Sequence, residues 1–403
     1  MAATAPTIQP KAKRKAISYF MRLLHLTPYY APAYEYGGVV RAVEGMAQAL
    51  VRRGHSVTVL TTNTGAESAP SDETLNGVRV VRAPNIIRRR ANLSTPQDIK
   101  RLALDLLPDI DLVHCHEFRT VENLIVTPLA AQQGVKLVLS PHGTLTYDTG
   151  RSKAKALWDK LLSPAVAQRF DHTIALTQAE ADEAQALWPT FGRRRIPTGF
   201  SVVPNGVNMT EFANLDGRKA FRVRYGSGDG VVCLFMGRLH PRKGVDVLAQ
   251  AFRSLAIADA KLVIVGPDEG MLAALMPLLD ERVIVTGYLG GAERLAAFAA
   301  ADLLALPAVG EGLPMAVLEA LAGGLPVLIS PGCNLPEVAT SGAGLIVEPQ
   351  IEPLAAALRT LLTSANLRSE MGTAARQFAN ERFSWDAAAA QLESVYRSLI
   401  GRP

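Results

Sequence analysis

Short apolar segments alternate with stretches of helical periodicity along most of the chain, and this alternation restricts the folds that the chain can adopt. The apolar segments are rich in Val, Ile and Leu, and several end at a glycine or a proline. They predict strands over 22–26, 56–61, 78–82, 112–116, 136–140, 173–176, 231–236, 261–265, 283–286, 303–306, 326–330 and 344–347. Helices are predicted over 38–53, 154–169, 244–255, 293–301 and 314–322. Strands separated by helices indicate an α/β protein with parallel sheets.

The alternating pattern occurs twice, and the two series meet near residues 205–220. With 403 residues, the chain is also too long for one hydrophobic core. We therefore expect an N-terminal domain over 21–210 and a C-terminal domain over 211–384, followed by a helix over 385–403 that packs back across the domains. Residues 1–20 are expected to form a disordered basic extension. Because ligands bind beyond the carboxyl ends of parallel strands, the predicted site is a cleft between the two sheets.

Much of the excess positive charge, +5 overall, lies in basic clusters at 11–15, 88–90 and 193–195. Solvated surface is the simplest interpretation, and contact with an anionic membrane is the alternative. Nucleic acid is not expected as a partner, because no aromatic residues alternate with these charges. The three cysteines are widely spaced and indicate neither a disulfide framework nor a zinc site. Without a long apolar run or a signal-peptide pattern, the sequence predicts a cytoplasmic protein, with peripheral contact at the inner face of the cell membrane as an alternative.

The segment 311–319 places two carboxylates around the start of a helix, just after a predicted strand. Pro314 suits the first turn of a helix, because its missing N–H would have no partner there. Backbone N–H groups over 313–315 would face the cleft and stabilise an anion. Glu311 in the loop and Glu319 two turns along the helix would accept hydrogen bonds from hydroxyl groups. A phosphate together with hydroxyls describes a nucleotide sugar, and the alternative is an ordinary capped helix.

The segment 237–246 places cations in another loop between a strand and a helix. Arg238 and Lys243 could neutralise a diphosphate in the same cleft, Arg by forked hydrogen bonds and Lys as a point charge. They would also stabilise the negative charge that develops on a departing nucleoside diphosphate. Arg242, in the same loop, is expected to be solvated.

The chain resembles a large family of retaining glycosyltransferases, family 4, in three sequence elements. These are, in order, Pro204-Asn205-Gly206-Val207, the Gly-Arg-Leu-x-Pro-x-Lys-Gly pattern of 237–244 and the paired glutamates of 311–319. The family includes bacterial mannosyl- and glucosyltransferases and relatives of sucrose synthase and trehalose synthase. The resemblance covers nearly the whole chain from Met21 and implies the GT-B fold, in which two Rossmann-like domains face each other across a cleft. The stretch 331–337 is similar to part of some enzymes of bacterial surface-polysaccharide assembly.

The resemblance implies a role for each residue that matches the family pattern. His142 would lie near the reacting sugar, Glu311 would contact sugar hydroxyls and Glu319 the ribose. The implied catalytic set is His142, Arg238, Lys243 and Glu311. Further donor contacts are implied for Gly37, Gly38, Tyr288, Leu289, Gly312, Leu313, Pro314, Met315 and Glu319. Two residues at a strand end, His116 and Glu117, could reach the acceptor, although one of His114 and His116 is expected to be only a rim residue.

These assignments imply a retaining hexosyltransferase that moves a hexose from UDP-glucose or GDP-mannose to a glycan or lipid-linked acceptor in polysaccharide or glycolipid synthesis. The nucleotide sugar is a co-substrate, and no further cofactor is expected. No metal is expected either, because Asp109 and Asp111 precede a predicted strand and so point away from the cleft. The alternatives are an epimerase or phosphorylase of related fold, a nucleotide-sugar-binding protein without catalysis, and a basic membrane or nucleic-acid adaptor.

Overall fold

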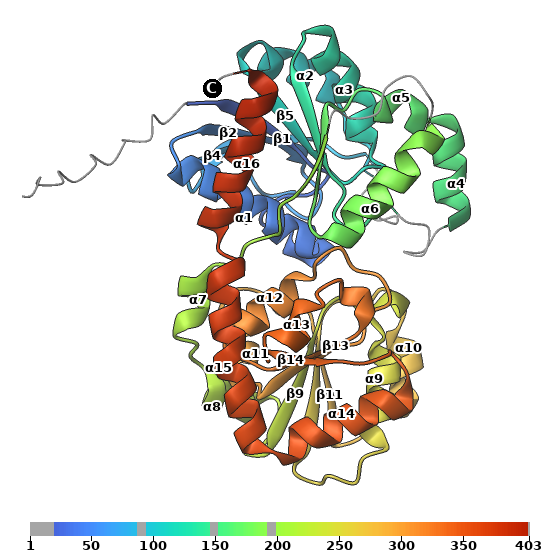
Figure 1. The fold of residues 1–403 in the computed structure, drawn as a ribbon, viewed down its shortest axis with the longest axis vertical. Coiled ribbons are helices and arrows are strands. Elements are labelled where there is room, and N and C mark those ends of the chain that lie inside the picture. Colours follow the sequence, from blue (N-terminus) through green and yellow to red (C-terminus); the bar gives the residue numbers. More distant parts are fainter. Residues whose placement is uncertain (1–19, 87–93, 146–151, 192–198, 402–403) are drawn as a thin grey trace, which may run out of the picture.

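The computed structural model describes residues 20–86, 94–145, 152–191 and 199–401. The expected basic extension, apart from Phe20, lies outside these residues, as do the basic clusters at 88–90 and 193–195. Two α/β units lie one above the other in Figure 1, and each contains one sheet.

The first sheet has eight strands in the order β3-β4-β2-β1-β5-β6-β7-β8. Their bounds are β1 (Arg22–Leu26), β2 (Ser56–Thr62), β3 (Asp72–Leu75), β4 (Val78–Ala83), β5 (Leu112–His116), β6 (Lys136–Ser140), β7 (His172–Ala175) and β8 (Gly199–Val202). The pairings are parallel except that β3 is antiparallel to β4. Neither β3 nor β8 was expected from the sequence. Both lie at edges of the sheet and contain no buried side chain, so neither has the apolar pattern of an inner strand.

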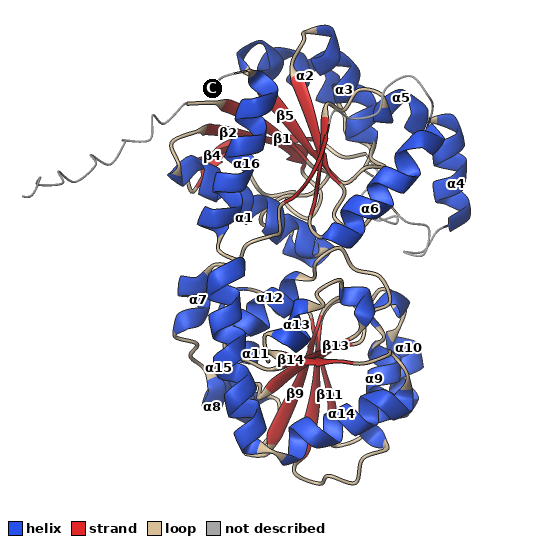
Figure 2. Ribbon diagram, viewed as in Figure 1, coloured by secondary structure: helices blue, strands red, loops and turns tan. Residues whose placement is uncertain are grey.

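The second sheet has six parallel strands in the order β11-β10-β9-β12-β13-β14. Their bounds are β9 (Val231–Met236), β10 (Ala260–Val265), β11 (Val283–Gly287), β12 (Leu303–Leu306), β13 (Val327–Ile329) and β14 (Gly344–Ile346). The central strands β9 and β12 are almost continuous runs of buried apolar residues, because helices cover both faces of the sheet (Figure 2). The expected α/β class with parallel sheets is confirmed.

Sixteen α-helices connect and cover these strands within the described residues. Their bounds are α1 (Gly38–Arg52), α2 (Ile99–Leu106), α3 (Val121–Gln132), α4 (Ser152–Leu161), α5 (Ser163–Ala167), α6 (Gln178–Leu187), α7 (Met209–Ala213), α8 (Arg218–Arg224), α9 (Val245–Arg253), α10 (Leu272–Leu275), α11 (Gly291–Ala300), α12 (Met315–Ala322), α13 (Glu337–Thr340), α14 (Ile351–Thr363), α15 (Ala365–Arg382) and α16 (Trp385–Ile400). The single helix expected over 154–169 is wrong. Pro164, which lacks a backbone N–H, lies at the start of α5, and the chain divides there into α4 and α5. None of the helices that the structure describes combines the length and apolar character needed to cross a bilayer.

The last helix leaves the unit of the second sheet and packs on the unit of the first. In Figure 1, α15 lies beside the lower unit and α16 beside the upper one, where it packs against α1. Trp385 begins α16 and is buried against two glycines, Gly45 in α1 and Gly206 in the connecting chain. A Cβ atom on either glycine would lie under 3.0 Å from Trp385. At the same place, Val207 donates a backbone hydrogen bond to the carbonyl of Phe383 at 2.7 Å.

Replacing Gly45 with alanine tests this packing. Alanine is the better helix former by about 1 kcal/mol, but its methyl group would overlap the Trp385 ring. We expect Gly45→Ala to lower the free energy of unfolding by about 1–3 kcal/mol in urea denaturation. In a Trp385→Leu background the same change should be neutral or stabilising. Wild-type stability of the Gly45→Ala single variant would contradict the packing described here.

Candidate active site

A cleft opens between the carboxyl ends of the two sheets, and side chains from both units line it. The first unit contributes the loop after β1 and the residues that follow β5 and β6, while the second contributes the loops after β9, β11 and β12. Every residue predicted for the site except His116 lines this cleft: Gly37, Gly38, Glu117, His142, Arg238, Lys243, Tyr288, Leu289, Glu311, Gly312, Leu313, Pro314, Met315 and Glu319. Their individual roles stay predictions.

Two glycines allow a loop of the first unit and a loop of the second to approach until their backbone atoms are in contact. A Cβ atom on Gly143 would lie under 3.0 Å from the backbone nitrogen of Gly312, and one on Gly312 would lie 2.8 Å from that of Gly143. Gly143 also has φ +71°, a backbone conformation that residues with a side chain rarely adopt. Because His142 precedes Gly143 and Glu311 precedes Gly312, this contact brings the two predicted catalytic residues to the same point of the cleft.

Lys243 and Glu311 form an ion pair with 2.8 Å between Nζ and Oε2. Lys243 ends a 3-10 turn that follows β9, and Glu311 lies in the loop after β12. The Glu311 backbone is held on both sides, because its N–H donates to Gly332 at 2.8 Å and its carbonyl accepts from the Asn334 side chain at 2.6 Å. The stretch 331–337 therefore positions Glu311, a function that the sequence alone did not indicate.

Arg238 is held by Glu269, whose two carboxylate oxygens each lie 2.9 Å from one guanidinium nitrogen. The predicted glycine loop approaches this arginine, since a Cβ on Gly37 would lie 3.3 Å from Arg238 Nε. A Cβ on Gly38 would lie equally close, 3.3 Å, to the side chain of Met315. Both glycines therefore face residues of the second unit across the cleft.

Arg242 is not the solvated side chain that was expected. It lines the cleft, and its guanidinium donates a hydrogen bond to the carbonyl of Gly310 in the Glu311 loop. Burial lowers its pKa from the usual value, although the nearby Glu311 carboxylate opposes this shift. The cleft therefore receives three cationic side chains from the loop after β9 rather than two.

Glu319 is buried on α12 and is paired with Arg294, a residue that the sequence analysis missed. Arg294 NH1 lies 2.8 Å from Glu319 Oε2, and NH2 donates to Glu211 at 3.2 Å. Burial raises the pKa of Glu319, while the charges of Arg294 and Arg41 oppose the rise. Since α12 begins at Met315, Glu319 lies little more than one turn from its start, not two. Arg294 also lines the cleft, so the pair is fixed beside any ligand that Glu319 contacts.

Glu117 and His142 both have left-handed backbone conformations, with φ of 62° and 56°. They follow the neighbouring strands β5 and β6 and lie at the cleft, where such strained residues often mark a functional site. The turn after His142 is held by Glu180, whose carboxylate accepts from the N–H groups of Gly143 and Leu176. Burial raises the pKa of Glu117 to about 7, and Arg238 partly opposes this shift.

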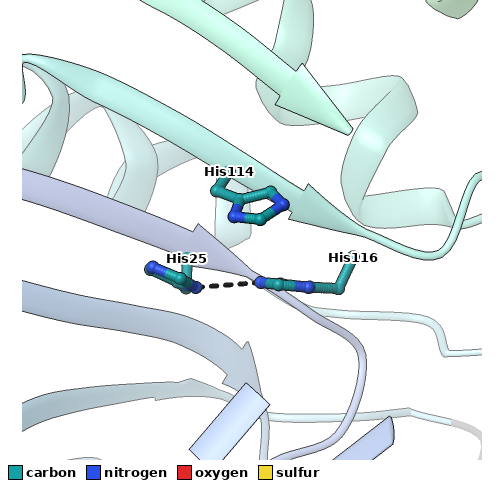
Figure 3. Close-up of side chains that lie close together, drawn as sticks. All are labelled: His25, His114 and His116. Carbon is teal, nitrogen blue, oxygen red and sulfur yellow. Dashed lines mark hydrogen bonds between the residues drawn. The ribbon is translucent and has the colours of Figure 1, made fainter. Parts of the chain in front are cut away.

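His116 lies behind His142 and does not line the cleft, which corrects the predicted contact of His116 with an acceptor. His114 and His116 are both fully buried, so neither is the expected rim residue. His116 bonds to His25 and to His142, while His114 bonds to Tyr396 Oη at 2.6 Å and to Ser140 Oγ at 2.8 Å. The sequence analysis missed His25, which lies on β1 beside His114 and His116 (Figure 3).

One ring nitrogen from each of His25, His114 and His116 lies within 4.8 Å of the other two, a spacing at which three imidazoles could hold a metal ion. In this structure, hydrogen bonds engage one nitrogen of His25 and both nitrogens of the other two rings. Burial lowers the pKa of His25 to about 3 and that of His142 to about 4, and it places those of His114 and His116 well below the usual value. The four rings are therefore neutral near pH 7.

The buried Arg294–Glu319 pair can be tested through protein stability. Arg294→Met should lower the free energy of unfolding by about 3–5 kcal/mol, because it leaves a buried carboxylate without its partner. The matched control is Arg224→Met, which removes an exposed ion pair with Glu293 and should cost about 0–1 kcal/mol. Urea denaturation of both variants measures the difference, and equal losses would show that burial does not strengthen the Arg294 pair.

Comparison with known proteins agrees with this architecture. The model of "Glycosyltransferase Family 4" matches residues 36–211, and that of "Glycosyl transferases group 1" matches residues 218–378. D-inositol 3-phosphate glycosyltransferase of Kineococcus radiotolerans is 30% identical over 94% of this chain and 94% of its own length. The GDP-mannose-dependent monoacylated alpha-(1-6)-phosphatidylinositol monomannoside mannosyltransferase of Corynebacterium glutamicum is 29% identical over 85% of this chain and 90% of its own.

Among solved structures, that of HepE from Anabaena in complex with UDP-glucose is similar, with a TM-score of 0.74 at 19% identity. The match covers 94% of this chain and 100% of that chain, and it shows the GT-B fold. The fold, the two family models and the near full-length relatives lead to one assignment. The chain belongs to the family-4 glycosyltransferases with the GT-B fold and is an enzyme that transfers a sugar from a nucleotide-sugar donor.

Proposed function

We propose that this chain is a retaining hexosyltransferase that moves glucose or mannose from UDP-glucose or GDP-mannose to a glycan or lipid-linked acceptor. The observation that carries the proposal is the meeting of His142, Glu311 and the cations Arg238, Lys243 and Arg242 in one cleft between two parallel sheets. The names of the compared proteins support the donors, since one relative is GDP-mannose-dependent and the HepE structure contains UDP-glucose.

The donor diphosphate would bind to the second unit. Arg238, Lys243 and Arg242 supply positive charge there, and the backbone N–H groups at the start of α12 add a partial positive charge. Arg238 and Lys243 are each paired with a carboxylate, so a diphosphate must compete with Glu269 and Glu311 for them. Glu311 would then be free to accept hydrogen bonds from the sugar, and Glu319 would contact the ribose while Arg294 holds it in place.

The acceptor would enter from the first unit. Glu117, with a pKa near neutrality, lines that side of the cleft and is suited to hydrogen bonding with an acceptor hydroxyl. The compared relatives are named for inositol phosphate and phosphatidylinositol mannoside acceptors, which supports a polyol or lipid-linked acceptor in polysaccharide or glycolipid synthesis.

In the proposed reaction, the bond between the anomeric carbon and the phosphate oxygen breaks while the acceptor oxygen bonds to the same face of the sugar. The acceptor hydroxyl gives its proton to the departing phosphate oxygen, so atoms and charge balance without a covalent enzyme intermediate. Positive charge at Arg238 and Lys243 stabilises the departing diphosphate. Glu311, released from Lys243 when the diphosphate binds, orients the sugar.

Glu311→Gln tests whether Glu311 orients the sugar. The variant should lower kcat for transfer by about 100-fold, the loss typical of a contact made in the transition state. Binding of UDP or GDP should be unchanged or tighter in calorimetry, because Lys243 loses its competing carboxylate. Glu269→Gln is the matched control, since it also frees a cation of the cleft but should change kcat only a few-fold. Wild-type turnover by Glu311→Gln would refute the assigned role, and donor binding without transfer by the wild-type protein would indicate a binding protein.

Metal independence is a separate part of the proposal. Because three cations and helix N–H groups face the predicted diphosphate, excess EDTA should leave transfer nearly intact. Lys243→Ala should lower kcat by about 100-fold or more, whereas Lys261→Ala on the surface should not change it. Transfer that is abolished by EDTA and restored by Mn²⁺ would contradict this account of how the leaving group is stabilised.

A further inference from the structure

Three buried histidines form a continuous hydrogen-bonded chain from the interior of the first sheet to the cleft. His25 Nδ1 lies 2.9 Å from His116 Nε2, and His116 Nδ1 lies 2.9 Å from His142 Nε2. The residues come from β1, β5 and the turn after β6, which are neighbours in the sheet. Figure 3 shows the inner bond, with His25 and His116 pointing toward each other and His114 beside them.

The protons of these three rings are coupled. Each N···N contact needs one protonated and one unprotonated nitrogen, and a neutral imidazole carries a single N–H. His116 must therefore donate to one neighbour and accept from the other. This leaves two arrangements for the whole chain. In one, His142 donates inward from Nε2 and the proton not used in the chain is on His25 Nε2. In the other, His25 donates outward from Nδ1 and the unused proton is on His142 Nδ1.

The surroundings of the two ends favour the second arrangement. His25 is fully buried, and its Nε2 has no hydrogen-bond partner among the described residues. A proton there would be a permanently unsatisfied buried donor, whereas an unpaired lone pair is tolerated better. His142 Nδ1 is also buried and has no partner in the described residues, but the residue as a whole is 9% exposed and lines the cleft, whereas His25 does not line it. The second arrangement therefore places the unused proton on the one ring of the three that borders the cleft, where a bound ligand can accept it.

We infer that His25 and His116 are positioning residues that hold His142 in the tautomer protonated at Nδ1, so that His142 offers a hydrogen-bond donor to an oxygen of the bound substrate. The functional part of this inference rests on the proposed role of His142 in sugar transfer. Since both of its nitrogens are then committed, one protonated and one accepting from His116, His142 cannot act as the base. This agrees with the proposed transfer of the acceptor proton to the departing phosphate oxygen.

The tautomer can be observed directly and independently of activity. The chain contains seven histidines, so the ring nitrogens of a ¹⁵N-histidine-labelled protein can be assigned by comparison with a His142→Gln variant. Long-range ¹H–¹⁵N spectra near pH 7 distinguish protonated from unprotonated ring nitrogens. We expect Nδ1 of His142 and Nδ1 of His25 to be the protonated nitrogens. Protonation of His142 at Nε2 in the wild-type protein would overturn the inference, whether or not the protein transfers sugar.

Substitutions at His25 test the coupling along the chain. In His25→Asn the amide nitrogen can replace Nδ1 as the donor to His116, so His142 should keep its tautomer and kcat should stay near wild type. His25→Leu removes the donor, so His142 should become a mixture of tautomers and kcat should fall about tenfold with little change in KM, as for one lost transition-state hydrogen bond. The matched control is Tyr396→Phe, which removes a buried hydrogen bond to His114 beside the chain and should leave the His142 tautomer unchanged.

Each outcome has a distinct meaning. An unchanged His142 tautomer in a folded His25→Leu protein would overturn the coupling. If that variant does not fold, the wild-type and His25→Asn spectra still decide the tautomer. Stoichiometric zinc in the purified protein, bound by His25, His114 and His116, would also overturn the inference, because the metal would occupy the lone pairs that the chain uses. The expected tautomers in a protein that transfers no sugar would support the chain and refute the proposed function alone.

Discussion

The close approach of Gly143 to Gly312 is the contact on which the geometry of the site depends. Only glycine permits two backbones from different domains to meet in this way, and a methyl group at either position would force the loops apart. His142 and Glu311 each lie one residue away from the contact. Their common position is therefore set by the backbone, and the long side chains of Lys243, Arg238 and Arg242 adapt around it. A shift of one domain would separate the residues proposed to act on the sugar from both sides.

Buried and half-buried polar groups maintain this geometry on each side of the contact. In the first unit, Glu180 holds the turn after His142 through two backbone N–H groups, and its pKa is raised by burial to about 7. In the second unit, Asn334 and the backbone of Gly332 hold the Glu311 loop, while Arg294 holds Glu319. Such satisfied networks are directional, unlike apolar packing, and they specify one arrangement of the loops. The functional side chains are thus oriented before any ligand binds.

Sequence periodicity predicted the inner strands well for a physical reason. Strands such as 231–236 and 303–306 are buried on both faces, so every residue in them is apolar and the bounds are sharp. The rule that ligands bind at the carboxyl ends of strands then brought fourteen predicted residues into one cleft. What could not be predicted were pairings across the fold, such as Arg294 with Glu319 or His25 with His116. These depend on which strands and helices become neighbours, and a single sequence carries no local signal for that.

The paired crossings between the domains have a mechanical consequence. The chain passes from the first domain to the second near Val207 and returns near Phe383, and these two crossings are hydrogen-bonded to each other, with Trp385 wedged beside them. Two connections at widely separated points would oppose rotation of one domain against the other. Crossings joined at one place act instead as a single pivot, about which the domains can swing open and return to the same relative position. Substrate entry and product exit can then occur without loss of alignment between the two halves of the site.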